Sequence, residues 1–347
     1  MKKRGILYYF KFLLFPFAVL YGTIVFIRNL FFDLGIRSSK SFQIPVIAVG
    51  NLSVGGTGKS PQIEYLIRLL KNKKKIAVLS RGYKRKSEGF LLANENTQME
   101  DLGDEPFQFF SNHPDVLISV DADRVNGINN LLQLHPDIEV ILLDDAYQHR
   151  KVQASFYALL TSFESIYSND FLLPIGTLRE SRNGAKRAKA IIITKCPKDL
   201  KEQKQNEIVT QINPLSNQKV YFSYIDYAKN LISNDKILPF EELKNFEVLL
   251  ITGIANPKPL LSYLEESGIE YKHEKFADHY NFTQTDIENI KNSFEKISSE
   301  NKIILTTEKD YMRLKGKLPS LYFIGIETKF LNETSKDFDL QILEEVD

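Results

Sequence analysis

The sequence contains little cysteine and almost no net charge, and both shortages narrow what the protein can be. Cys196 is the one cysteine in 347 residues, so the chain cannot form an internal disulfide, which favours a reducing compartment. The 45 Lys and Arg residues nearly balance the 44 Asp and Glu residues, and a net charge of +1 gives no global field that points to nucleic acid. A chain of this length, with 43% hydrophobic residues, suits about two globular domains.

The N-terminal segment departs from this average composition. Residues 1–4 are basic, and two apolar stretches follow at 6–10 and 12–27, separated by one lysine. The second stretch is slightly shorter than the ~20 residues that span a bilayer. No small-x-small cleavage site follows it, which argues against a signal peptide. A transmembrane helix, a monotopic helix in one leaflet and a buried core helix all stay open. Membrane contact is favoured because the large apolar residues leave no polar face, so we expect residues 1–30 to form a membrane anchor helix.

The rest of the chain alternates strand and helix patterns. Apolar strand patterns such as 44–49 and 140–143 alternate with helical patterns such as 104–112 and 124–134. This alternation predicts an α/β fold with a doubly wound, mostly parallel sheet. A turn-rich stretch then precedes a second alternation. We therefore expect a phosphate-loop core domain at 31–224, a linker at 225–245 and a second, smaller α/β domain at 246–347 that closes over the active site.

A glycine-rich loop lies between an apolar strand and an amphipathic helix. A phosphate chain needs closely approaching backbone N–H donors, a helix N-terminus, one lysine and a hydroxyl for Mg²⁺, and this segment supplies each of them. The usual pattern begins with glycine, whereas here serine occupies that position. The predicted nucleotide-binding residues are Ser53, Val54, Gly55, Gly56, Thr57, Gly58, Lys59 and Ser60.

A pair of acidic residues follows the apolar strand at 140–143. Asp144 and Asp145 lie where a neighbouring strand of a nucleotide site is expected to supply carboxylates for Mg²⁺. The competing interpretation is a solvated pair at a strand end. His149, a few residues further on, either orients these groups or lies on the surface.

Three further segments carry residues that suit phosphoryl transfer, and each also has an ordinary structural explanation. Asp104 and Glu105 open a helix, where acidic residues complement the helix dipole. Arg179 and Glu180 suit an anion clamp or a surface ion pair. His279, beside an aspartate, suits a base or a plain loop residue.

Six motifs occur in one order along the chain. They are GNLSVGGTGKSP at 50–61, LSRGY at 79–83, GDEP at 103–106, DDAYQH at 144–149, LRE at 178–180 and DHY at 278–280. Together they resemble the tetraacyldisaccharide 4′-kinase family of the lipid A pathway. That family also has a hydroxyl residue where Ser53 stands, and the motifs extend to about Asp310, so the resemblance covers nearly the whole chain. The family often has Gly-Phe where Ala146 and Tyr147 stand, and proline where Ser181 stands.

The resemblance implies a reaction. The γ-phosphoryl group of ATP would pass to the 4′-hydroxyl of a tetraacylated glucosamine disaccharide 1-phosphate, giving lipid IVA for lipopolysaccharide synthesis. The implied partners are this lipid and a membrane surface, with no obligate protein partner. The implied location is the cytoplasmic face of the bacterial inner membrane, with the lipid entering near the anchor.

The resemblance also implies residue roles. Asp104 would act as catalytic base with His279, across the cleft between two domains joined by a small β linker. Lys59 and Ser60 match the phosphate and Mg²⁺ contacts, and Asp144 and Asp145 match the acidic pair at the metal. Arg179, Glu180 and Glu105 match other active-site positions, Arg179 as a catalytic cation and Glu105 at the metal.

Two other functions remain open on the residues alone. A membrane-associated ATPase switch explains the anchor, the loop and Asp144, but gives no reason for Asp104 and His279. A soluble small-molecule kinase would bury its N-terminal helix. A lipid acceptor explains the apolar N-terminus better, because such a substrate stays in the bilayer and the enzyme must come to it.

Overall fold

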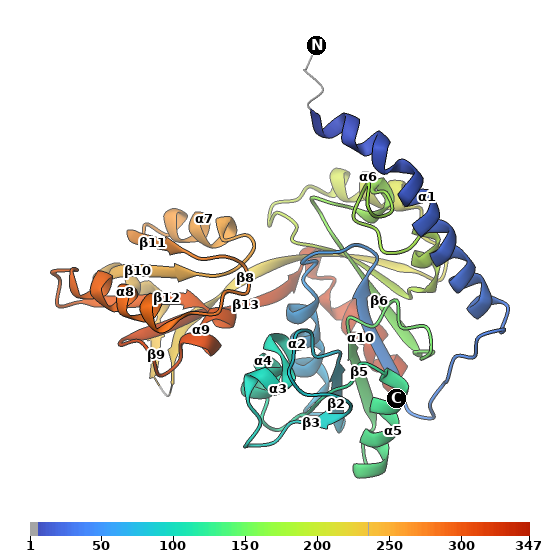
Figure 1. Cartoon of the computed structure of the whole chain (residues 1–347), viewed down its shortest axis with the longest axis horizontal. Helices are drawn as coiled ribbons and strands as arrows, with labels where there is room; N and C mark the ends of the chain where they lie inside the picture. Colours follow the sequence, from blue (N-terminus) through green and yellow to red (C-terminus); the bar gives the residue numbers. More distant parts are fainter. Residues whose placement is uncertain (1–5, 235) are drawn as a thin grey trace. The chain divides into compact units, whose positions relative to one another are not determined.

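The computed structural model describes residues 6–234 and 236–347, and it describes side chains from Leu13 onward (Figure 1). The basic residues at 1–4 lie outside this part of the chain. The chain forms two compact units, one made of Met1–Ile225 and Thr328–Asp347 and the other of Asp226–Glu327. Both are α/β units, and almost all of their strand pairs are parallel, so the predicted fold class is confirmed.

The first unit is built on one sheet. The pairs from β8 across to β4 are parallel, and β3 is antiparallel to β4. Its strands, in spatial order, are β8 (Lys219–Ser233), β7 (Ala190–Thr194), β6 (Phe156–Ser162), β1 (Val46–Asn51), β5 (Val140–Asp144), β2 (Ile76–Ser80), β4 (Leu117–Val120) and β3 (Leu91–Leu92). Its helices are α1 (Ile6–Asp33), α2 (Lys59–Leu70), α3 (Met99–Leu102), α4 (Asp104–Asn112), α5 (Arg124–Leu134), α6 (Glu202–Ile212) and α10 (Ser335–Val346), with short 3₁₀ turns at Tyr167–Asn169, Arg182–Arg187 and Leu331–Glu333.

Helices cover both faces of this sheet, as alternation along β1 requires. Ile47 and Val49 lie in one core cluster with residues of α2, α4 and α10. Val46 and Ala48 point to the other face and share a cluster with residues of α5. A strand buried on both faces favours apolar side chains at successive positions, which is why residues 46–49 of β1 are all apolar. The carboxyl ends of the parallel strands meet at one edge, where ligands bind in such sheets.

The second unit repeats this plan on a smaller scale. Its strand order is β11 (Tyr271–Lys275), β10 (Glu247–Thr252), β12 (Lys302–Thr307), β13 (Leu321–Phe330) and β8, with β9 (Lys236–Pro239) antiparallel to β8. Its helices are α7 (Lys258–Glu266), α8 (Gln284–Glu295) and α9 (Glu308–Leu314), with a 3₁₀ turn at Phe240–Asn245. Val248 and Leu250 pack with α7, and Leu249 and Ile251 pack with α8.

The domain limits differ from the predicted ones in two places. The stretch expected as a linker at 225–245 is mostly strand, because β8 continues to Ser233 and pairs with β9. The last 20 residues, expected in the second domain, belong to the first unit. The reason is that Phe338, Ile342 and Val346 on α10 are buried in the core cluster that contains α2.

The N-terminal segment forms one long helix, as predicted. α1 contains Pro16, and its stretch Leu13–Asp33 is long and apolar enough to cross a membrane by length and composition. Large apolar side chains on it are exposed, among them Leu20 at 60% and Ile24 at 60%. That exposure does not fit the buried core helix that a soluble kinase would have.

Candidate active site

The glycine-rich loop connects β1 to α2 at the carboxyl edge of the sheet, as predicted. Gly55 has φ +111° and Gly58 has φ +83°, backbone conformations that other residues adopt only with strain. Gly58 caps α2, so the first N–H groups of that helix face the loop. The hydroxyl of Thr194 donates to the carbonyl oxygen of Thr57 at 2.8 Å, and the Asn51 amide donates to the Thr57 hydroxyl at 2.8 Å. The loop is therefore tied through Thr57 to the ends of β1 and β7.

Ser53 and Val54 fix the start of the loop. Ser53 forms an isolated β-bridge with Leu178, and the Val54 N–H donates to the carbonyl oxygen of Thr177 at 2.8 Å. Gly56 lies at the exposed part of the loop, where its carbonyl oxygen accepts from Lys195 Nζ at 2.5 Å. The loop is thus tied on one side to the segment before Arg179 and on the other to the end of β7.

Asp145 brings two predicted cations together. Its Oδ1 lies 3.8 Å from Lys59 Nζ and 3.0 Å from Arg179 Nη2. The pKa of Asp145 is lowered because these cations outweigh the burial that would raise it. Arg179 also donates to the side chain of Asn51 at the end of β1. Lysine, arginine and aspartate therefore form one charged group beside the loop.

Ser60 connects the loop to the two acidic residues that open α4. Its hydroxyl donates to Glu105 Oε1 at 2.9 Å. Asp104, the preceding residue, is half-buried at the first position of the same helix. The predicted metal hydroxyl and one predicted metal carboxylate are thus in contact, and the predicted base is the residue before that carboxylate.

Asp144 is a buried carboxylate at the end of β5. Its Oδ2 accepts from Ser80 Oγ at 3.0 Å, while its Oδ1 is buried with no hydrogen-bond partner. Burial and the neighbouring carboxylates of Glu105 and Asp145 raise the pKa of Asp144, against the effect of Lys59. An orphaned carboxylate oxygen among acidic neighbours and a serine hydroxyl suits an oxygen-preferring divalent cation. Among the described residues no group of three or more His, Cys, Asp or Glu side chains forms a ready metal site.

A buried arginine lies behind the acidic pair. Arg124 is 2% exposed and donates to the carbonyl oxygens of Asp121 at 2.6 Å and Asp144 at 3.1 Å. Burial lowers the pKa of Arg124 to about 10, while Asp144 and Asp145 act to raise it, so it stays charged at neutral pH. His149 bonds to the start of α5 and not to Asp144 or Asp145, since its Nε2 accepts the backbone N–H of Arg124 at 3.3 Å.

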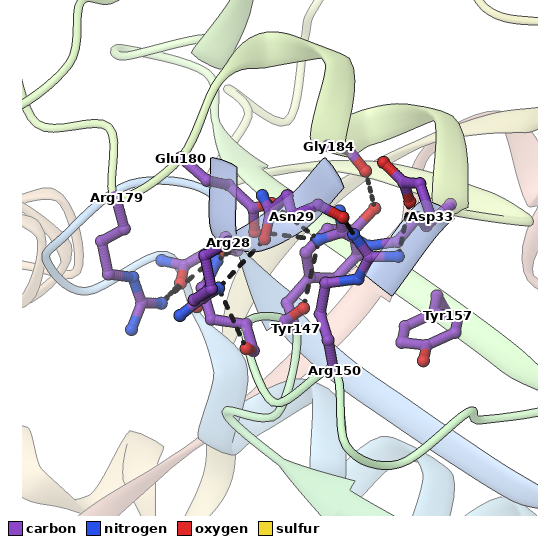
Figure 2. Close-up of polar contacts among 12 residues, drawn as sticks. Arg28, Asn29, Asp33, Tyr147, Arg150, Tyr157, Arg179, Glu180 and Gly184 are labelled. Carbon is purple, nitrogen blue, oxygen red and sulfur yellow. Dashed lines mark hydrogen bonds and ion pairs between the residues drawn. The ribbon is translucent and has the colours of Figure 1, made fainter. Parts of the chain in front are cut away.

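Glu180 is neither an exposed ion-pair partner nor paired with Arg179. Its side chain is fully buried, and both its oxygens lie 2.9 Å from Arg187 Nη2 (Figure 2). Gln148 donates to Oε1 at 2.9 Å and Asn29 donates to Oε2 at 3.1 Å. The carboxylate is therefore saturated with protein donors, which makes it a buried structural anchor next to Arg179.

His279 belongs to the second unit, in the loop after β11. It has φ +56°, and its Nδ1 lies 3.2 Å from Arg313 Nη2, while Arg313 Nη1 lies 3.4 Å from Asp310. Arginine can only donate, so Nδ1 accepts and the neutral ring carries its proton on Nε2. The ring is thus held in one tautomer. Its partnership with Asp104 stays a prediction.

Sequence reasoning did not identify Asn51, Thr194 or Lys195, although all three touch the loop or Arg179. A usable signal existed for each of them. Asn51 ends β1, and Thr194 and Lys195 lie at the end of β7, so all lie at the carboxyl ends of parallel strands. Applying that rule to every strand would have selected them.

Three comparisons place the chain among known proteins. The model of the family "Tetraacyldisaccharide-1-P 4'-kinase" matches residues 10–346. A tetraacyldisaccharide 4'-kinase of Flavobacterium johnsoniae is 54% identical over 334 residues, which cover 96% of each chain. One from Bacteroides thetaiotaomicron is 42% identical and is covered to 92% of its length, against 95% of this chain. Among solved structures, LpxK from Aquifex aeolicus in complex with ATP has a TM-score of 0.79 at 31% identity, covering 97% of this chain and 100% of that chain.

Proposed function

The chain belongs to the tetraacyldisaccharide-1-P 4′-kinase family, and we propose that the residues around its glycine-rich loop transfer the γ-phosphoryl group of ATP to the 4′-hydroxyl of a tetraacylated glucosamine disaccharide 1-phosphate. The products are lipid IVA, a precursor of lipid A, and ADP. ATP as the donor is supported by the ATP complex of the Aquifex aeolicus relative. The alternative of an ATPase switch without an acceptor is not favoured, since the matched relatives are named as kinases of this lipid.

One contact carries the assignment of residues, namely the hydrogen bond from Ser60 to Glu105. It joins the first turn of α2, where phosphates bind, to the first turn of α4, where Asp104 lies. An acceptor hydroxyl beside Asp104 would therefore lie next to the terminal phosphate, and positioning of this kind supplies much of the catalysis in phosphoryl transfer.

Mg²⁺ would be held by Ser60, Glu105, Asp144 and Asp145. Support comes from the buried Asp144 Oδ1, which has no partner, and from the oxygen donors around it. When bound, the ion would offset charge on the phosphate oxygens of ATP. The contribution of the protein residues is to hold these oxygens at the loop, with Arg124 limiting the repulsion between the carboxylates.

Asp104 would take the proton of the attacking hydroxyl. As base it accepts that proton while the oxygen bonds to phosphorus and the bridging oxygen leaves with ADP. His279 would assist as the partner of Asp104, its ring orientation fixed by Arg313. Both roles come from the family resemblance, and the position of Asp104 beside Glu105 supports the first of them.

Lys59 and Arg179 would stabilise the charge that moves during transfer. Both approach Asp145, which favours their placement beside the loop. Fixed cations of this kind need no reorganisation at the moment of reaction. Lys59 is proposed for the phosphates directly, and Arg179 as a second catalytic cation near it.

α1 would anchor the enzyme at the cytoplasmic face of the bacterial inner membrane. Its exposed apolar side chains and its length support contact with a bilayer. A four-chain lipid does not leave the bilayer, so the acceptor reaches the enzyme there. ATP is supplied from the cytoplasm, which sets the side of the membrane.

A purified preparation distinguishes the kinase from the ATPase switch. ATP consumption is measured with and without the tetraacylated disaccharide in mixed micelles. We expect consumption to depend on the acceptor and to match the phosphorylated lipid formed. Equal consumption without the acceptor would contradict the kinase assignment.

A further inference from the structure

We propose that Tyr21 on α1 is a positioning residue for Arg179, so that the apolar helix is also part of the scaffold of the active site. The inference rests on the proposed role of Arg179 in the transfer step. It concerns how the arginine is held, which neither the family resemblance nor the relatives describe.

The backbone of Arg179 is held on both sides. Its N–H donates to the carbonyl oxygen of Leu52, one residue beyond β1, at 2.7 Å. Its carbonyl oxygen accepts from the hydroxyl of Tyr21 at 2.7 Å, across 158 residues of sequence. The peptide that carries the guanidinium is thus fixed between the glycine-rich loop and α1.

A second residue of α1 holds the next position in the chain. Asn29 donates to Glu180 Oε2 at 3.1 Å (Figure 2). Arg28 Nη2 lies 3.4 Å from the backbone carbonyl oxygen of Gln148, whose side-chain Nε2 donates to Glu180. Tyr21 and Asn29 are about two helical turns apart and so lie on the same side of α1. Consecutive residues of the active-site segment are therefore both bound by one face of the helix.

α1 also packs closely against Leu172, which precedes Arg179 in the chain. A Cβ added at Gly22, beside Tyr21, would come within 2.8 Å of Leu172 Cδ1. Residues on the opposite side of α1 from Tyr21 expose apolar side chains, such as Val19 at 52% and Phe26 at 59%. One side of α1 thus suits lipid, while another makes polar contacts with residues 179–180.

The guanidinium of Arg179 connects the fixed backbone at this residue to the charged group formed with Asp145 and Lys59. Arg179 bonds Asp145 through both terminal nitrogens, at 3.0 and 3.4 Å, and the same carboxylate faces Lys59. A shift of the Arg179 backbone therefore changes a fork-shaped contact whose geometry depends on angle as well as distance. Loss of the Tyr21 hydroxyl is expected to loosen the arginine without removing any charge.

The first test compares two α1 variants that each lose one hydroxyl. Tyr21→Phe removes the bond to Arg179, whereas Thr23→Val removes a hydroxyl that bonds within the helix, to the carbonyl oxygen of Val19 at 2.9 Å. We expect Tyr21→Phe to lower kcat about 3- to 10-fold, the effect of one hydrogen bond, with KM for the lipid and sedimentation with vesicles unchanged. Thr23→Val should match the wild type. A kcat of Tyr21→Phe equal to that of Thr23→Val, or a loss confined to vesicle binding, would overturn the proposal.

A double-mutant cycle shows whether Tyr21 acts through Arg179. Arg179→Lys keeps a cation but loses the fork, so Tyr21→Phe should cost little further activity in that background. An equal loss of kcat in both backgrounds would mean that Tyr21 acts elsewhere and would overturn the inference. An unchanged kcat in Arg179→Lys alone would count against the catalytic role of Arg179 itself.

Discussion

The Ser60 hydroxyl lies 2.9 Å from Glu105 Oε1, and this contact joins two segments that each carry part of the chemistry. One segment is the glycine-rich loop with the start of α2, which presents N–H groups and Lys59. The other is the start of α4, where Asp104 precedes Glu105. The loop proposed for ATP and the segment with the proposed base Asp104 thus belong to one unit of the chain.

Lys59→Ala is expected to weaken ATP binding and to reduce turnover about 100-fold. The reason is that Lys59 supplies a fixed cation at the loop, and removing one preorganised group that stabilises transition-state charge lowers kcat by about 100-fold or more in other enzymes. Equilibrium ATP binding and steady-state turnover are the measurements. Lys71→Ala, just past the other end of α2 and paired with an exposed aspartate, is the matched control and should behave like the wild type. Retention of both ATP binding and rate by Lys59→Ala would discredit the phosphate-loop assignment.

Glu180→Ala is expected to destabilise the first unit by about 3–5 kcal/mol. The substitution leaves the Arg187 guanidinium without its carboxylate, and an uncompensated cation beside a buried site costs this much. Thermal unfolding monitored by circular dichroism should show the loss. Glu207→Ala, which breaks an exposed pair with Lys204, should change the midpoint little. A midpoint like that of the wild type would show that Glu180 is not the structural anchor described above.

Asp144→Asn is expected to raise the Mg²⁺ concentration needed for half-maximal turnover by about 10-fold or more. Asparagine keeps the shape and one oxygen but removes the charge that the ion would meet. A Mg²⁺ titration at saturating ATP is the measurement, with the exposed Asp137→Asn as control. An unchanged Mg²⁺ requirement would remove Asp144 from the metal site.

His113 should make the fold sensitive to mild acid. The ring is buried with no hydrogen-bond partner for either nitrogen, and burial, together with Lys71 and Arg68, lowers its pKa to about 4. The unfolded chain binds the proton near pH 6.5 and the folded chain near 4. Stability from the neutral ring is therefore complete above pH 6.5 and is lost as the pH falls towards 4.

The matching experiment follows the free energy of unfolding between pH 7 and pH 4. The wild type should lose about 1–3 kcal/mol more than His113→Gln, which cannot titrate. Parallel curves for the two proteins would show that this ring does not sense pH.

Local patterns predicted the loop and the acidic pair because each depends on a short segment. The phosphate-binding role of Gly55–Ser60 is predicted from a strand, a tight loop and the start of a helix. The position of Asp144 is predicted from the end of a buried strand. Tyr21 could not be found in this way. Its partner lies 158 residues away, and in sequence it is one more aromatic residue in an apolar stretch.

The end of the chain shows a second limit of local patterns. The spacing of Phe338, Ile342 and Val346 is helical, but it does not say which core the helix joins. That choice depends on α2 and β1 residues far away in sequence, so the return of Thr328–Asp347 to the first unit was missed. Glu180 was misjudged for the same reason, since Arg187 and Asn29 approach it only in the folded unit.

The most direct measurement is transfer of labelled γ-phosphate from ATP to a defined tetraacylated disaccharide 1-phosphate, with the phosphorylated position determined. Asp104→Asn is compared with Asp101→Asn. Asp101 takes part in the capping box of α3, and asparagine at this position still offers a side-chain oxygen for the cap. We predict label at the 4′-hydroxyl, a loss of 100-fold or more in kcat for Asp104→Asn with ATP affinity retained, and wild-type transfer by Asp101→Asn. Label at another position, or full turnover without the Asp104 carboxylate, would contradict the account.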